Sequence, residues 1–460
     1  MDISALIAAQ RAYFAAGSTR SLEFRRSSLQ NLHDALTTHQ SRLFDALQAD
    51  LRKSPGEAYT SDIGIVLSEV RHAIAKLNRW MKPRRVRVPL LTWPARAWVK
   101  PEPFGVTLIL GPWNYPVQLT LLPLVGAIAA GNTAVLKPSE LSPRTSTAIA
   151  ELVGQTFAPE YIAVVEGDST AAEALLREKV DKIFFTGSTR VGKRVMAAAA
   201  VNLTPVTLEL GGKSPCLVCA DAPLKLSARR IAWGKFLNAG QSCVAPDFVL
   251  VDRSVRDAFL DELRLTLWEF FGENPQASAD FGRIINRRHF DRLAGYLSGG
   301  RIYLGGQTDA ADLYLAPTIL TDVAPDQPVM LDEIFGPILP VIEFVDLDEA
   351  LAMLCNRPTP LALYLFTADR AVQRRVVAET RSGGVCINDT IVHMIGKDLP
   401  FGGLGDSGIG AYHGKASFDC FSHHRSVMRR SLWIDPHFRY PPPRFPLKTL
   451  QRAYRFLMGA

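Results

Sequence analysis

The segment KIFFTGSTRVGKRVMAAAA, residues 182–200, joins an apolar run of strand length to a helical pattern through one glycine-bearing turn. A strand that passes through such a turn into a helix is the building unit of a parallel sheet with helical crossovers. The turn GSTRVGKR, residues 187–194, nearly satisfies the phosphate-loop pattern, but Arg194 stands where a serine or threonine would hold magnesium. The segment therefore predicts an α/β fold. It favours a dinucleotide-phosphate site at the helix N-terminus, with a plain strand–helix turn as the alternative.

The same alternation of short apolar runs and helical segments extends over the neighbouring sequence. The runs VTLILG, TAVLKPSE and IAVVEG, which begin at residues 106, 133 and 162, each end in turn residues. After TLELGGKSP, residues 207–215, the pattern resumes with PCLVCAD, FVLVD, APTILTDV and PVIEFV. Two successive α/β units are therefore expected.

Helical and extended segments precede these units. In the first eighty residues leucines recur at helical spacing, as in Leu29, Leu32 and Leu36, which predicts amphipathic helices. A second helical pattern covers residues 57–81. The segment KPRRVRVPLLTWPARAWVKPEP, residues 82–103, alternates apolar residues with Arg and Pro, which predicts an extended ribbon with exposed edges.

The bulk composition excludes several classes of protein. A chain of 460 residues is too long for one ordinary core, so two or three domains are expected. The net charge of +7 is mild at this length, and no nucleic acid partner is expected. Six scattered cysteines and an N-terminus without a signal-peptide pattern predict a cytoplasmic protein. The most apolar window, residues 119–136, is interrupted by Pro and Gly, which predicts a buried helix and strand rather than a membrane span.

Several motif matches carry no predicted chemistry. GLGDSG, residues 403–408, satisfies G-x-G-x-x-G, but no strand precedes it, so a turn-rich loop is expected. CLVC, residues 216–219, lies in an apolar run, which favours buried core cysteines over a redox pair. No second C-x-x-C, no H-E-x-x-H and no G-x-S-x-G occurs, so we expect neither a metal site nor a serine hydrolase.

One thiol differs from the other five in its surroundings. Cys243 lies in NAGQSCVAPDFVL, residues 238–250, between a helical run that ends near Gly240 and a predicted strand. Taken alone, such a cysteine is more often a small half-buried residue than a nucleophile. A nucleophile needs a base and an oxyanion donor. Three segments offer them: LELGG with Glu209, GPWNYP with Asn114, and DEIFGPILP with Glu333 and Phe335.

Seven motifs, in this order, resemble the aldehyde dehydrogenase superfamily: GPWNYP, LKPSE, FTGS, TLELGGKSP, GQSC, EIFGP and LPFGG. The similarity covers nearly the whole chain, and GQSCVAPDFVL with the short N-terminus resembles the class 3 branch, the fatty or aromatic aldehyde dehydrogenases. The resemblance implies an α/β fold with a Rossmann-like cofactor domain, an α/β catalytic domain and a β-ribbon oligomerisation arm. The implied divisions are residues 1–80 and 104–209 for the dinucleotide-binding domain, 210–394 for the catalytic domain, 81–103 and 395–443 for the arms, and 444–460 for a basic amphipathic tail.

The resemblance also implies a role for each matched residue. Cys243 is the expected nucleophile, Glu209 the general base and Asn114 the oxyanion donor. It stays open whether Glu333 shares the role of base with Glu209. The cofactor is expected to contact Trp113, Lys137, Glu140, Thr186, Gly187, Ser188, Gly192, Leu210, Glu333 and Phe335. The substrate pocket is expected to include Trp113, Tyr115, Trp233, Phe401 and His413.

The implied reaction is the oxidation of an aldehyde to a carboxylic acid with NAD(P)⁺, through a thiohemiacetal and a thioester on Cys243. Two alternatives stay open: a thioesterase or esterase that uses the same thiol, and a structural protein that retains the fold. Lys137 favours and Glu140 disfavours a 2′-phosphate, so NAD is expected with some use of NADP. Apolar residues near the expected entrance favour medium- or long-chain aliphatic, aromatic or isoprenoid aldehydes. These residues are Leu119, Leu121, Leu122, Ile391 and Met394.

The ribbon and the C-terminal region predict the partners of the chain. A homodimer is expected through RRVRVPLLTWPARAWV, residues 84–99, and SFDCFSHHRSV, residues 417–427, which resemble oligomerisation arms of the family. The tail RFPLKTLQRAYRFLMGA, residues 444–460, predicts a basic amphipathic helix that is too short to span a bilayer. Its apolar stripe is Leu447, Leu450, Tyr454 and Leu457. Contact of this helix with a membrane surface and packing on its own dimer stay open as alternatives.

Overall fold

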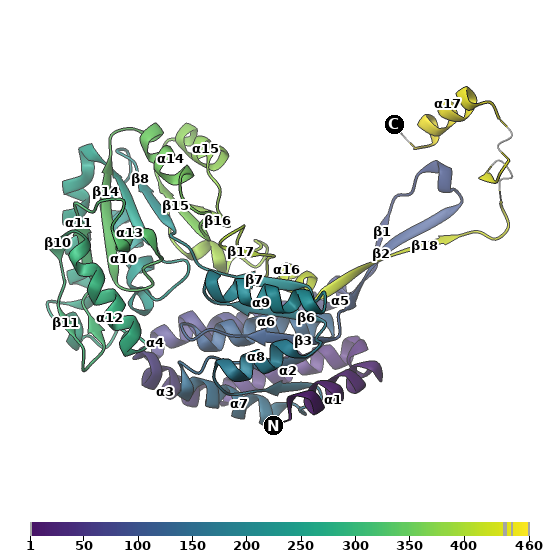
Figure 1. The fold of residues 1–460 in the computed structure, drawn as a ribbon, viewed down its shortest axis with the longest axis horizontal. Helices are drawn as coiled ribbons and strands as arrows, with labels where there is room; N and C mark the ends of the chain where they lie inside the picture. The colour runs from purple at the N-terminus through teal and green to yellow at the C-terminus, as the bar shows by residue number, and fades with distance from the viewer. Residues whose placement is uncertain (1, 436–438, 443–444, 459–460) are drawn as a thin grey trace.

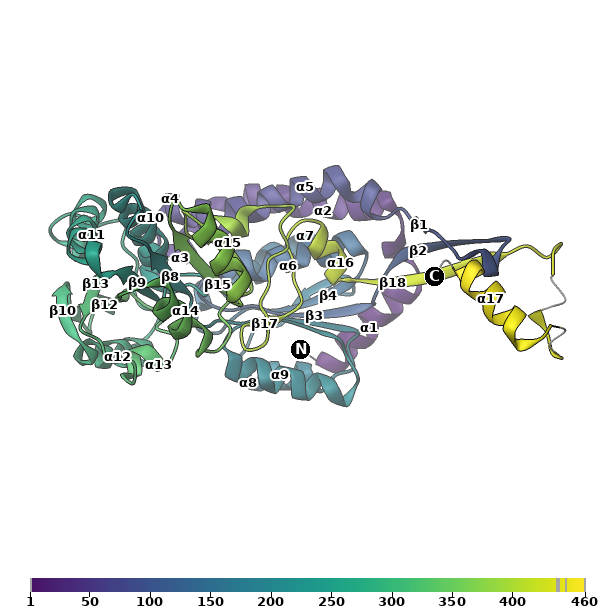
Figure 2. The same cartoon turned by 90° about the horizontal axis from the view of Figure 1, so that it is seen from above.

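A computed structural model describes residues 2–435, 439–442 and 445–458 of the chain. It has an α/β body built around two sheets, from which a narrow arm projects (Figure 1). Helix α17 lies at the far end of the arm, and a second view shows the same extension away from the body (Figure 2). Residues 436–438 and 443 of the predicted arms, and 444, 459 and 460 of the predicted tail, lie outside the described residues, as does Met1.

The first eighty residues are helical, as predicted. The elements are α1 (Ile3–Ala15), η1 (Ser18–Arg20), α2 (Leu22–Thr38), α3 (Gln40–Leu51), α4 (Pro55–Ala58), η2 (Tyr59–Ile63) and α5 (Gly64–Trp80). Leu29, Leu32 and Leu36 are fully buried, which confirms the predicted amphipathic face. The predicted helix over 57–81 is interrupted by η2, a π-helical turn whose Asp62 is fully buried. Such turns are often found at functional sites.

A six-stranded sheet follows, with the strand order β17-β7-β6-β3-β4-β5. Its strands are β3 (Val106–Leu110), β4 (Thr133–Lys137), β5 (Ile162–Val164), β6 (Lys182–Thr186), β7 (Val206–Glu209) and β17 (Gly408–Ile409). Its crossover helices are α6 (Pro116–Ala130), α7 (Pro143–Thr156), α8 (Ser169–Arg177) and α9 (Thr189–Val201). All pairs are parallel except β17 with β7. The alternating pattern of the sequence therefore predicted this sheet correctly.

A seven-stranded sheet has the order β10-β13-β14-β9-β8-β15-β16. Its strands are β8 (Pro215–Val218), β9 (Phe248–Asp252), β10 (Arg301–Leu304), β13 (Thr318–Thr321), β14 (Ile338–Phe344), β15 (Ala362–Phe366) and β16 (Gly384–Ile387). The helices and turns around it are α10 (Leu224–Phe236), η4 (Leu237–Gly240), η5 (Arg253–Val255), α11 (Arg256–Phe271), η6 (Pro275–Ala277), α12 (Arg287–Tyr296), η7 (Leu297–Gly299), α13 (Pro328–Leu331), α14 (Leu347–Cys355), α15 (Arg370–Glu379) and η8 (Val392–Ile395). A two-stranded sheet of β11 (Thr308–Asp309) and β12 (Tyr314–Leu315) lies apart from it.

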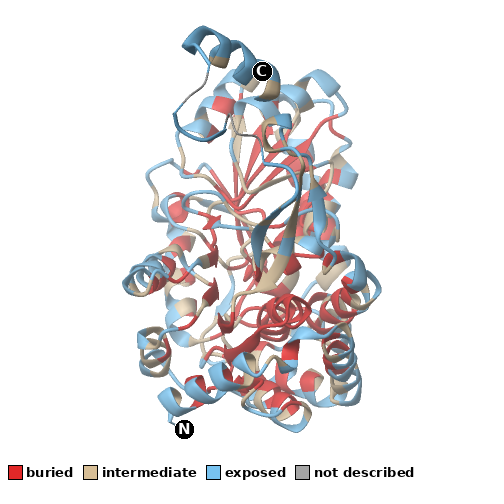
Figure 3. Cartoon of the chain, turned by 90° about the vertical axis from the view of Figure 1, so that its right-hand side faces the viewer, coloured by how far each residue is buried: buried red, intermediate tan, exposed pale blue. Residues whose placement is uncertain are grey.

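The arm is a three-stranded antiparallel sheet, which confirms the predicted ribbon. Its strands are β1 (Arg84–Val86), β2 (Ala95–Pro103) and β18 (Ser422–Arg430), with η3 (Leu90–Thr92) between β1 and β2 and α16 (Lys415–Cys420) before β18. The arm is mostly exposed, whereas buried residues fill the centre of the body (Figure 3). Helix α17 (Leu447–Met458) lies against η3. Of the predicted apolar stripe of the tail, Leu450 and Leu457 are half-buried and Leu447 and Tyr454 are exposed.

Two predictions need correction. The helix expected to end near Gly240 ends at Phe236, because Asn238 and Ala239 adopt left-handed φ values of 52° and 51°. The GLGDSG segment is a loop, as predicted, but its last residue begins β17 and so adds a strand to the six-stranded sheet.

The apolar window 119–136 is buried helix and strand as predicted. Among the described residues, none of the helices is both long enough and apolar enough to cross a bilayer.

Candidate active site

The chain crosses from the six-stranded to the seven-stranded sheet directly after β7. Glu209 ends β7, Gly211 and Gly212 follow, and β8 begins at Pro215. The loop that carries Cys243 leads from η4 into β9, which is the neighbour of β8. The predicted chemical groups therefore meet at the junction of the two sheets, a common position for ligand sites.

The thiol of Cys243 is half-buried and lies in the field of two carboxylates. Burial, followed by the negative charges of Glu333 and Glu209, raises the pKa of the Cys243 thiol to about 12. The next residue is held in place by the hydroxyl of Tyr364, which donates to the carbonyl of Val244 at 2.5 Å. Since the thiolate is the nucleophilic form, reaction at neutral pH requires a base close to Cys243.

The carboxylate of Glu209 is buried without a hydrogen bond. Only 3% of the residue is exposed, and neither Oε1 nor Oε2 has a partner. Burial raises the pKa of Glu209 well above its usual range. An unpaired buried carboxyl group is costly to a fold, and such groups concentrate at functional sites. Both oxygens are free to accept a proton.

Glu333 approaches the same junction from the loop before β14. A Cβ built on Gly211 would lie 2.0 Å from Oε2 of Glu333, so the carboxylate rests against the glycine backbone. Burial, and after it the charge of Asp247, raises the pKa of Glu333 to about 8. Arg292 fixes the loop by donating to the carbonyls of Glu333 at 3.3 Å and Ile334 at 2.8 Å.

A second backbone contact joins the Glu333 loop to the Cys243 loop. Gly240 has a φ of +74°, and a Cβ there would lie 2.2 Å from the carbonyl oxygen of Gly336. Only a glycine allows this approach. The nucleophile loop and the carboxylate loop are therefore in direct contact.

Asn114 is linked to the backbone that leads into Cys243. Its Nδ2 donates to the carbonyl of Gln241 at 3.1 Å, and its own carbonyl accepts from Nδ2 of Asn238 at 2.8 Å. Asn114 is buried, in the turn between β3 and α6. The structure therefore joins Asn114 to the backbone two residues before Cys243, and it places Glu209 and Glu333 where their charges act on the Cys243 thiol.

Three predicted cofactor residues lie between β6 and α9. The Oγ1 of Thr186 is buried without a hydrogen-bond partner. Ser188 caps α9, where its Oγ accepts from the N–H of Val191 at 3.5 Å, and the N–H of Gly187 donates to the carbonyl of Glu209 at 3.0 Å. An unpartnered hydroxyl beside a helix N-terminus fits the pyrophosphate of a dinucleotide.

The remaining cofactor residues lie on both sides of this turn. A Cβ on Gly192 would lie 2.6 Å from Cδ2 of Leu210, so the glycine lets α9 pack closely against Leu210. Lys137, at the end of β4, donates through Nζ to Oε2 of Glu140 at 2.5 Å. The two groups expected at the adenosine ribose therefore form an ion pair.

Aromatic rings line the region between the two loops. The ring centroids of Trp113 and Phe335 are 5.3 Å apart in an edge-on arrangement, and Phe335 adopts a left-handed φ of 50°. A φ in this region is costly for a bulky residue and recurs at ligand sites. The ring of Tyr115 is buried under the ammonium group of Lys53, which lies 4.0 Å from its centroid.

A second aromatic cluster contains two of the predicted substrate residues. The rings of Phe401 and His413 are 5.3 Å apart, and Nδ1 of His413 lies 2.6 Å from the carbonyl of Met394. Burial lowers the pKa of His413 to about 4, so this ring is neutral near pH 7. Trp233 is not part of either cluster and leaves 40% of its surface exposed on α10. Leu121 and Leu122 are fully buried in the main core and add no exposed surface to an entrance.

Two buried lysines near this junction were not among the residues predicted from the sequence. Lys53 and Asp62 are both fully buried and form an ion pair of 2.7 Å. Lys235, in α10, is fully buried with no hydrogen-bond partner for Nζ, and burial lowers its pKa to about 8. Both lysines occur in helical or polar stretches that read as solvent-exposed, so no local signal could have identified them.

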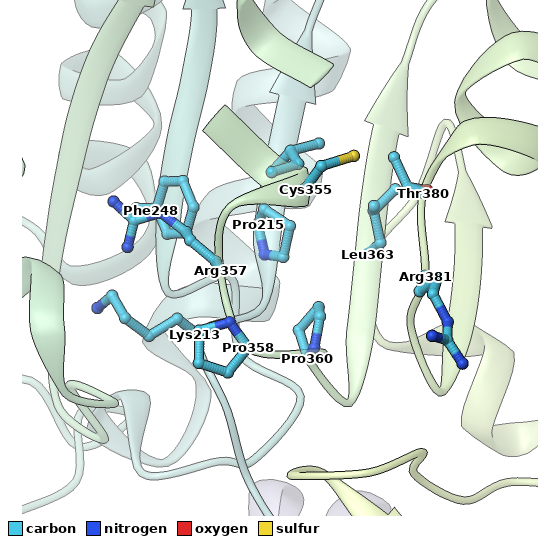
Figure 4. Close-up of a pocket in the computed structure, with 11 residues that line it drawn as sticks. Lys213, Pro215, Phe248, Cys355, Arg357, Pro358, Pro360, Leu363, Thr380 and Arg381 are labelled. Carbon is cyan, nitrogen blue, oxygen red and sulfur yellow. The ribbon is translucent and has the colours of Figure 1, made fainter. Parts of the chain in front are cut away.

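A small cavity lies apart from these residues, in the seven-stranded half of the body (Figure 4). Its lining includes the cationic side chains of Lys213, Arg357 and Arg381. None of the predicted site residues lines it. The chemistry described above therefore belongs to the junction and not to this cavity.

Comparisons with known proteins agree with one another. The sequence profile of the Aldehyde dehydrogenase family matches residues 1–427. The chain is 44% identical to the 4,4′-diaponeurosporen-aldehyde dehydrogenase of Staphylococcus aureus over 447 residues, which is 97% of each chain. It is 46% identical to a dimeric NADP-preferring aldehyde dehydrogenase of Canis lupus familiaris over 96% of this chain and 98% of that protein. A solved structure of substrate-bound Staphylococcus aureus AldH superposes with a TM-score of 0.96 at 43% identity, covering 99% of this chain and 100% of the other.

Proposed function

The chain belongs to the aldehyde dehydrogenase family, and from this premise we propose that Cys243, Glu209 and Asn114 carry out its reaction. The enzyme oxidises an aldehyde to a carboxylic acid with NAD(P)⁺, so the alternatives of a redox-free esterase and a structural protein fall away. The observation that carries the residue assignment is the meeting of Asn114, Glu209 and Glu333 around one thiol.

The first step is attack by Cys243 on the aldehyde carbon. The thiol proton passes to a nearby carboxylate, the sulfur–carbon bond forms, and the carbonyl electron pair moves onto oxygen. Nδ2 of Asn114 and the backbone N–H of Cys243 donate to this oxyanion. Loss of one such donor typically costs about 3–4 kcal/mol of transition-state stabilisation.

Oxidation and hydrolysis follow on the same sulfur. A bound NAD(P)⁺ would supply the hydride acceptor for this oxidation, and Cys243 would then carry the thioester. Glu209 accepts a proton from the attacking water, the carbon–sulfur bond breaks, and the thiolate is restored as the carboxylic acid leaves. Its free oxygens support this role for Glu209. The contact of Glu333 with Gly211 supports a role in orienting the nicotinamide ribose instead.

The cofactor is held by the residues on the β6–α9 turn and their neighbours. Thr186, Gly187, Ser188 and Gly192 would contact the pyrophosphate, and the unpartnered hydroxyl of Thr186 supports this assignment. Lys137 and Glu140 would contact the adenosine ribose. Glu333 and Phe335 would hold the nicotinamide ribose and ring, and Trp113 and Leu210 would complete the cofactor site. NAD is the proposed main cofactor, with some use of NADP. The reason is that the cation of Lys137 would attract a 2′-phosphate on the ribose, whereas the anion of Glu140 would repel it.

The proposed substrates are medium- or long-chain aliphatic, aromatic or isoprenoid aldehydes. The aromatic residues Tyr115, Trp233, Phe401 and His413 form the walls of the pocket, and His413 is neutral near pH 7. The name of the Staphylococcus aureus relative, a diaponeurosporen-aldehyde dehydrogenase, supports an apolar aldehyde. A series of aldehydes of rising chain length should give kcat/KM values that rise with length. A maximum at the shortest members would overturn this substrate class.

The proposed assembly is a homodimer that forms through the arm. The strand β18 lies at the edge of the arm sheet, and a long exposed edge strand is a liability unless another strand covers it. The Canis lupus familiaris relative is a dimeric aldehyde dehydrogenase by name, which supports this state. The division into a dinucleotide-binding domain, a catalytic domain and arms at the predicted boundaries remains part of the same proposal. Sedimentation at micromolar concentration tests the dimer, and a monomer would contradict it.

The tail is proposed to contact a membrane surface without crossing it. Leu447, Tyr454 and Phe456 of α17 are exposed, and its charged residues are the cations Lys448, Arg452 and Arg455. Such a helix binds anionic headgroups while its apolar side chains enter the interface. The full chain should float with vesicles that contain phosphatidylserine, and a chain that ends at residue 443 should not. Equal flotation of the two chains would overturn this contact.

Replacement of Cys243 tests the central assignment. Cys243→Ala should show no NADH formation at 340 nm and should bind NAD⁺ with its affinity unchanged within about twofold. The control is Cys219→Ala, which should retain turnover. Cys219 is a half-buried free thiol in the residue directly after β8. An active Cys243→Ala enzyme would end the proposal.

A further inference from the structure

A buried ion pair lies directly behind Asn114. Nζ of Lys53 donates to Oδ2 of Asp62 at 2.7 Å, and both side chains are fully buried. The same Nζ donates to the backbone carbonyl of Asn114 at 2.9 Å and lies 4.0 Å from the centroid of the Tyr115 ring. An ammonium group has three donors, and two of them are used in these hydrogen bonds while the charge lies over the ring.

The ion pair holds the turn that carries Asn114 at two points. Oδ1 of Asp62 accepts from the N–H of Gln118 at 3.1 Å, in the first turn of α6, where backbone N–H groups have no partner within the helix. Lys53 holds the chain four residues earlier, at the carbonyl of Asn114. The backbone of residues 114–118 is therefore fixed at both ends by one pair of charges.

The same segment also holds the loop of the nucleophile. Oε1 of Glu57 accepts from the N–H of Asn238 at 2.8 Å. Nδ2 of Asn238 in turn donates to the carbonyl of Asn114, which thus accepts from both Lys53 and Asn238. Residues 53–62 therefore connect the oxyanion turn and the nucleophile loop through direct hydrogen bonds.

Stability alone does not explain a charged pair at this position. Burial of two charges carries a large desolvation cost, and well-packed apolar side chains of similar volume often stabilise a fold equally well. Unlike an apolar contact, the hydrogen bonds of the pair are directional, so each of them fixes the position of the backbone atom that it reaches. The atoms fixed here are those that aim the carboxamide of Asn114.

We propose that Lys53 is a positioning residue for aldehyde oxidation, which acts through Asp62 and the Asn114 carbonyl to hold the Asn114 carboxamide over the reacting oxygen. This inference rests on the proposed role of Asn114 as oxyanion donor. Lys53 itself touches neither substrate nor cofactor. Its loss should therefore slow the chemical step in each active site and leave the binding of NAD⁺ unchanged.

The test is a double-mutant cycle with a neutral pair. Lys53→Met/Asp62→Asn removes both charges together, so no unpaired charge stays buried. The rate of the first NADH formed, divided by the number of titrated active sites, should fall about 10-fold or more. Deletion of an oxyanion donor removes its whole contribution to the rate, and displacement of the Asn114 carboxamide should remove part of that contribution. In an Asn114→Ala background the same pair should change this rate less than about twofold, since the donor is already absent.

Each outcome of the cycle has a separate meaning. An equal loss in both backgrounds would overturn the positioning role and leave the role of Asn114 intact. A wild-type rate in Asn114→Ala alone would overturn the oxyanion assignment and the positioning role with it. If the neutral pair fails to fold, Lys53→Leu/Asp62→Asn takes its place in the same two backgrounds, because it also leaves no unpaired charge buried and the carboxamide oxygen at position 62 can still accept from the N–H of Gln118.

The matched control is Arg25, another buried cation that contacts α6. Its Nη1 donates to the carbonyl of Ala129 at 3.2 Å, at the opposite end of the helix from Gln118. Arg25→Met should lower the melting temperature and leave the rate per titrated site unchanged. An equal loss of rate in this variant would show that any buried cation on α6 has the same effect, and it would contradict a specific role for Lys53.

Discussion

The carboxylate of Glu333 rests on the backbone of Gly211, where an added Cβ would lie 2.0 Å from Oε2. Because the end of a glutamate can move more easily than backbone, Gly211→Ala should displace the carboxylate. We expect the Kd for NAD⁺, measured by fluorescence titration, to rise about 10-fold, a loss of about 1.4 kcal/mol. In a Glu333→Ala background the same change should add little. Equal losses in both backgrounds would contradict the proposed contact of Glu333 with the cofactor.

The reactivity of the Cys243 thiol should depend on the charge of Glu333. Burial and the charges of Glu333 and Glu209 raise the pKa of Cys243 to about 12. Above pH 8, where Glu333 is ionised, Glu333→Gln removes one of these charges and should lower that pKa, so more thiolate is present. Alkylation of Cys243 by iodoacetamide between pH 8 and 10, followed by peptide mass spectrometry, should then be several-fold faster than in the unsubstituted chain, and the difference should shrink towards pH 7.

The exposed thiol of Cys355 is the internal reference for this experiment. Its alkylation is measured in the same digest and should not respond to Glu333→Gln. Identical rates at Cys243 in the two chains would contradict an electrostatic contact between the thiol and Glu333.

Glu333 should also make the stability of the fold depend on pH. Its pKa is about 8 in the folded chain against 4.5 as the ordinary value, so the folded state binds the proton more tightly. The free energy of unfolding therefore falls as the pH rises from about 4.5 to 8, by at most about 1.4 kcal/mol per pH unit. Glu333→Gln should melt higher than the unsubstituted chain at pH 8, and this gain should disappear near pH 4.5.

The exposed Glu273→Gln is the control for the loss of one surface carboxylate. Differential scanning fluorimetry at several pH values gives the melting temperatures. A melting temperature of Glu333→Gln that is lower than that of the unsubstituted chain at pH 8 would show that the ionised carboxylate stabilises the fold.

The ion pair of Lys137 and Glu140 should set the choice between NAD⁺ and NADP⁺. Glu140→Gln removes the anion that repels a 2′-phosphate, so the ratio of kcat/KM for NADP⁺ over NAD⁺ should rise about 10-fold. Lys137→Met is the matched variant with the opposite effect: it removes the cation that favours a 2′-phosphate and should lower the ratio of kcat/KM for NADP⁺ over NAD⁺. An equal change of kcat/KM with both cofactors in Glu140→Gln would remove Glu140 from the adenosine ribose.

The signals that predicted the fold are local in the chain. The strand–turn–helix pattern of residues 182–200 became β6 and α9, with Ser188 as the helix cap. The end of α10 was predicted four residues late, because the left-handed turn at Asn238 serves a hydrogen bond to Asn114, 124 positions away. Contacts of such separation leave no trace in the local sequence pattern.

The site was predictable only where a family motif marks it. The motifs with Glu209, Cys243 and Asn114 indicated the residues proposed to react, whereas Lys53 ends a helical pattern whose charged residues read as solvent-exposed. Its burial depends on Asp62 within the π-turn η2, and no periodicity predicted that turn. The sequence could therefore propose the reacting residues, but it gave no sign of the buried pair behind Asn114.

The central claim is that aldehyde oxidation proceeds through a thioester on Cys243 whose hydrolysis needs Glu209. The direct measurement is rapid mixing of Glu209→Gln with NAD⁺ and a long-chain aldehyde, followed by mass spectrometry of the quenched protein. We predict a burst of about one NADH per active site, little further turnover, and an acyl group attached to Cys243 in the stalled enzyme. Continued turnover of Glu209→Gln, or a burst of NADH without an acyl group on Cys243, would contradict the account.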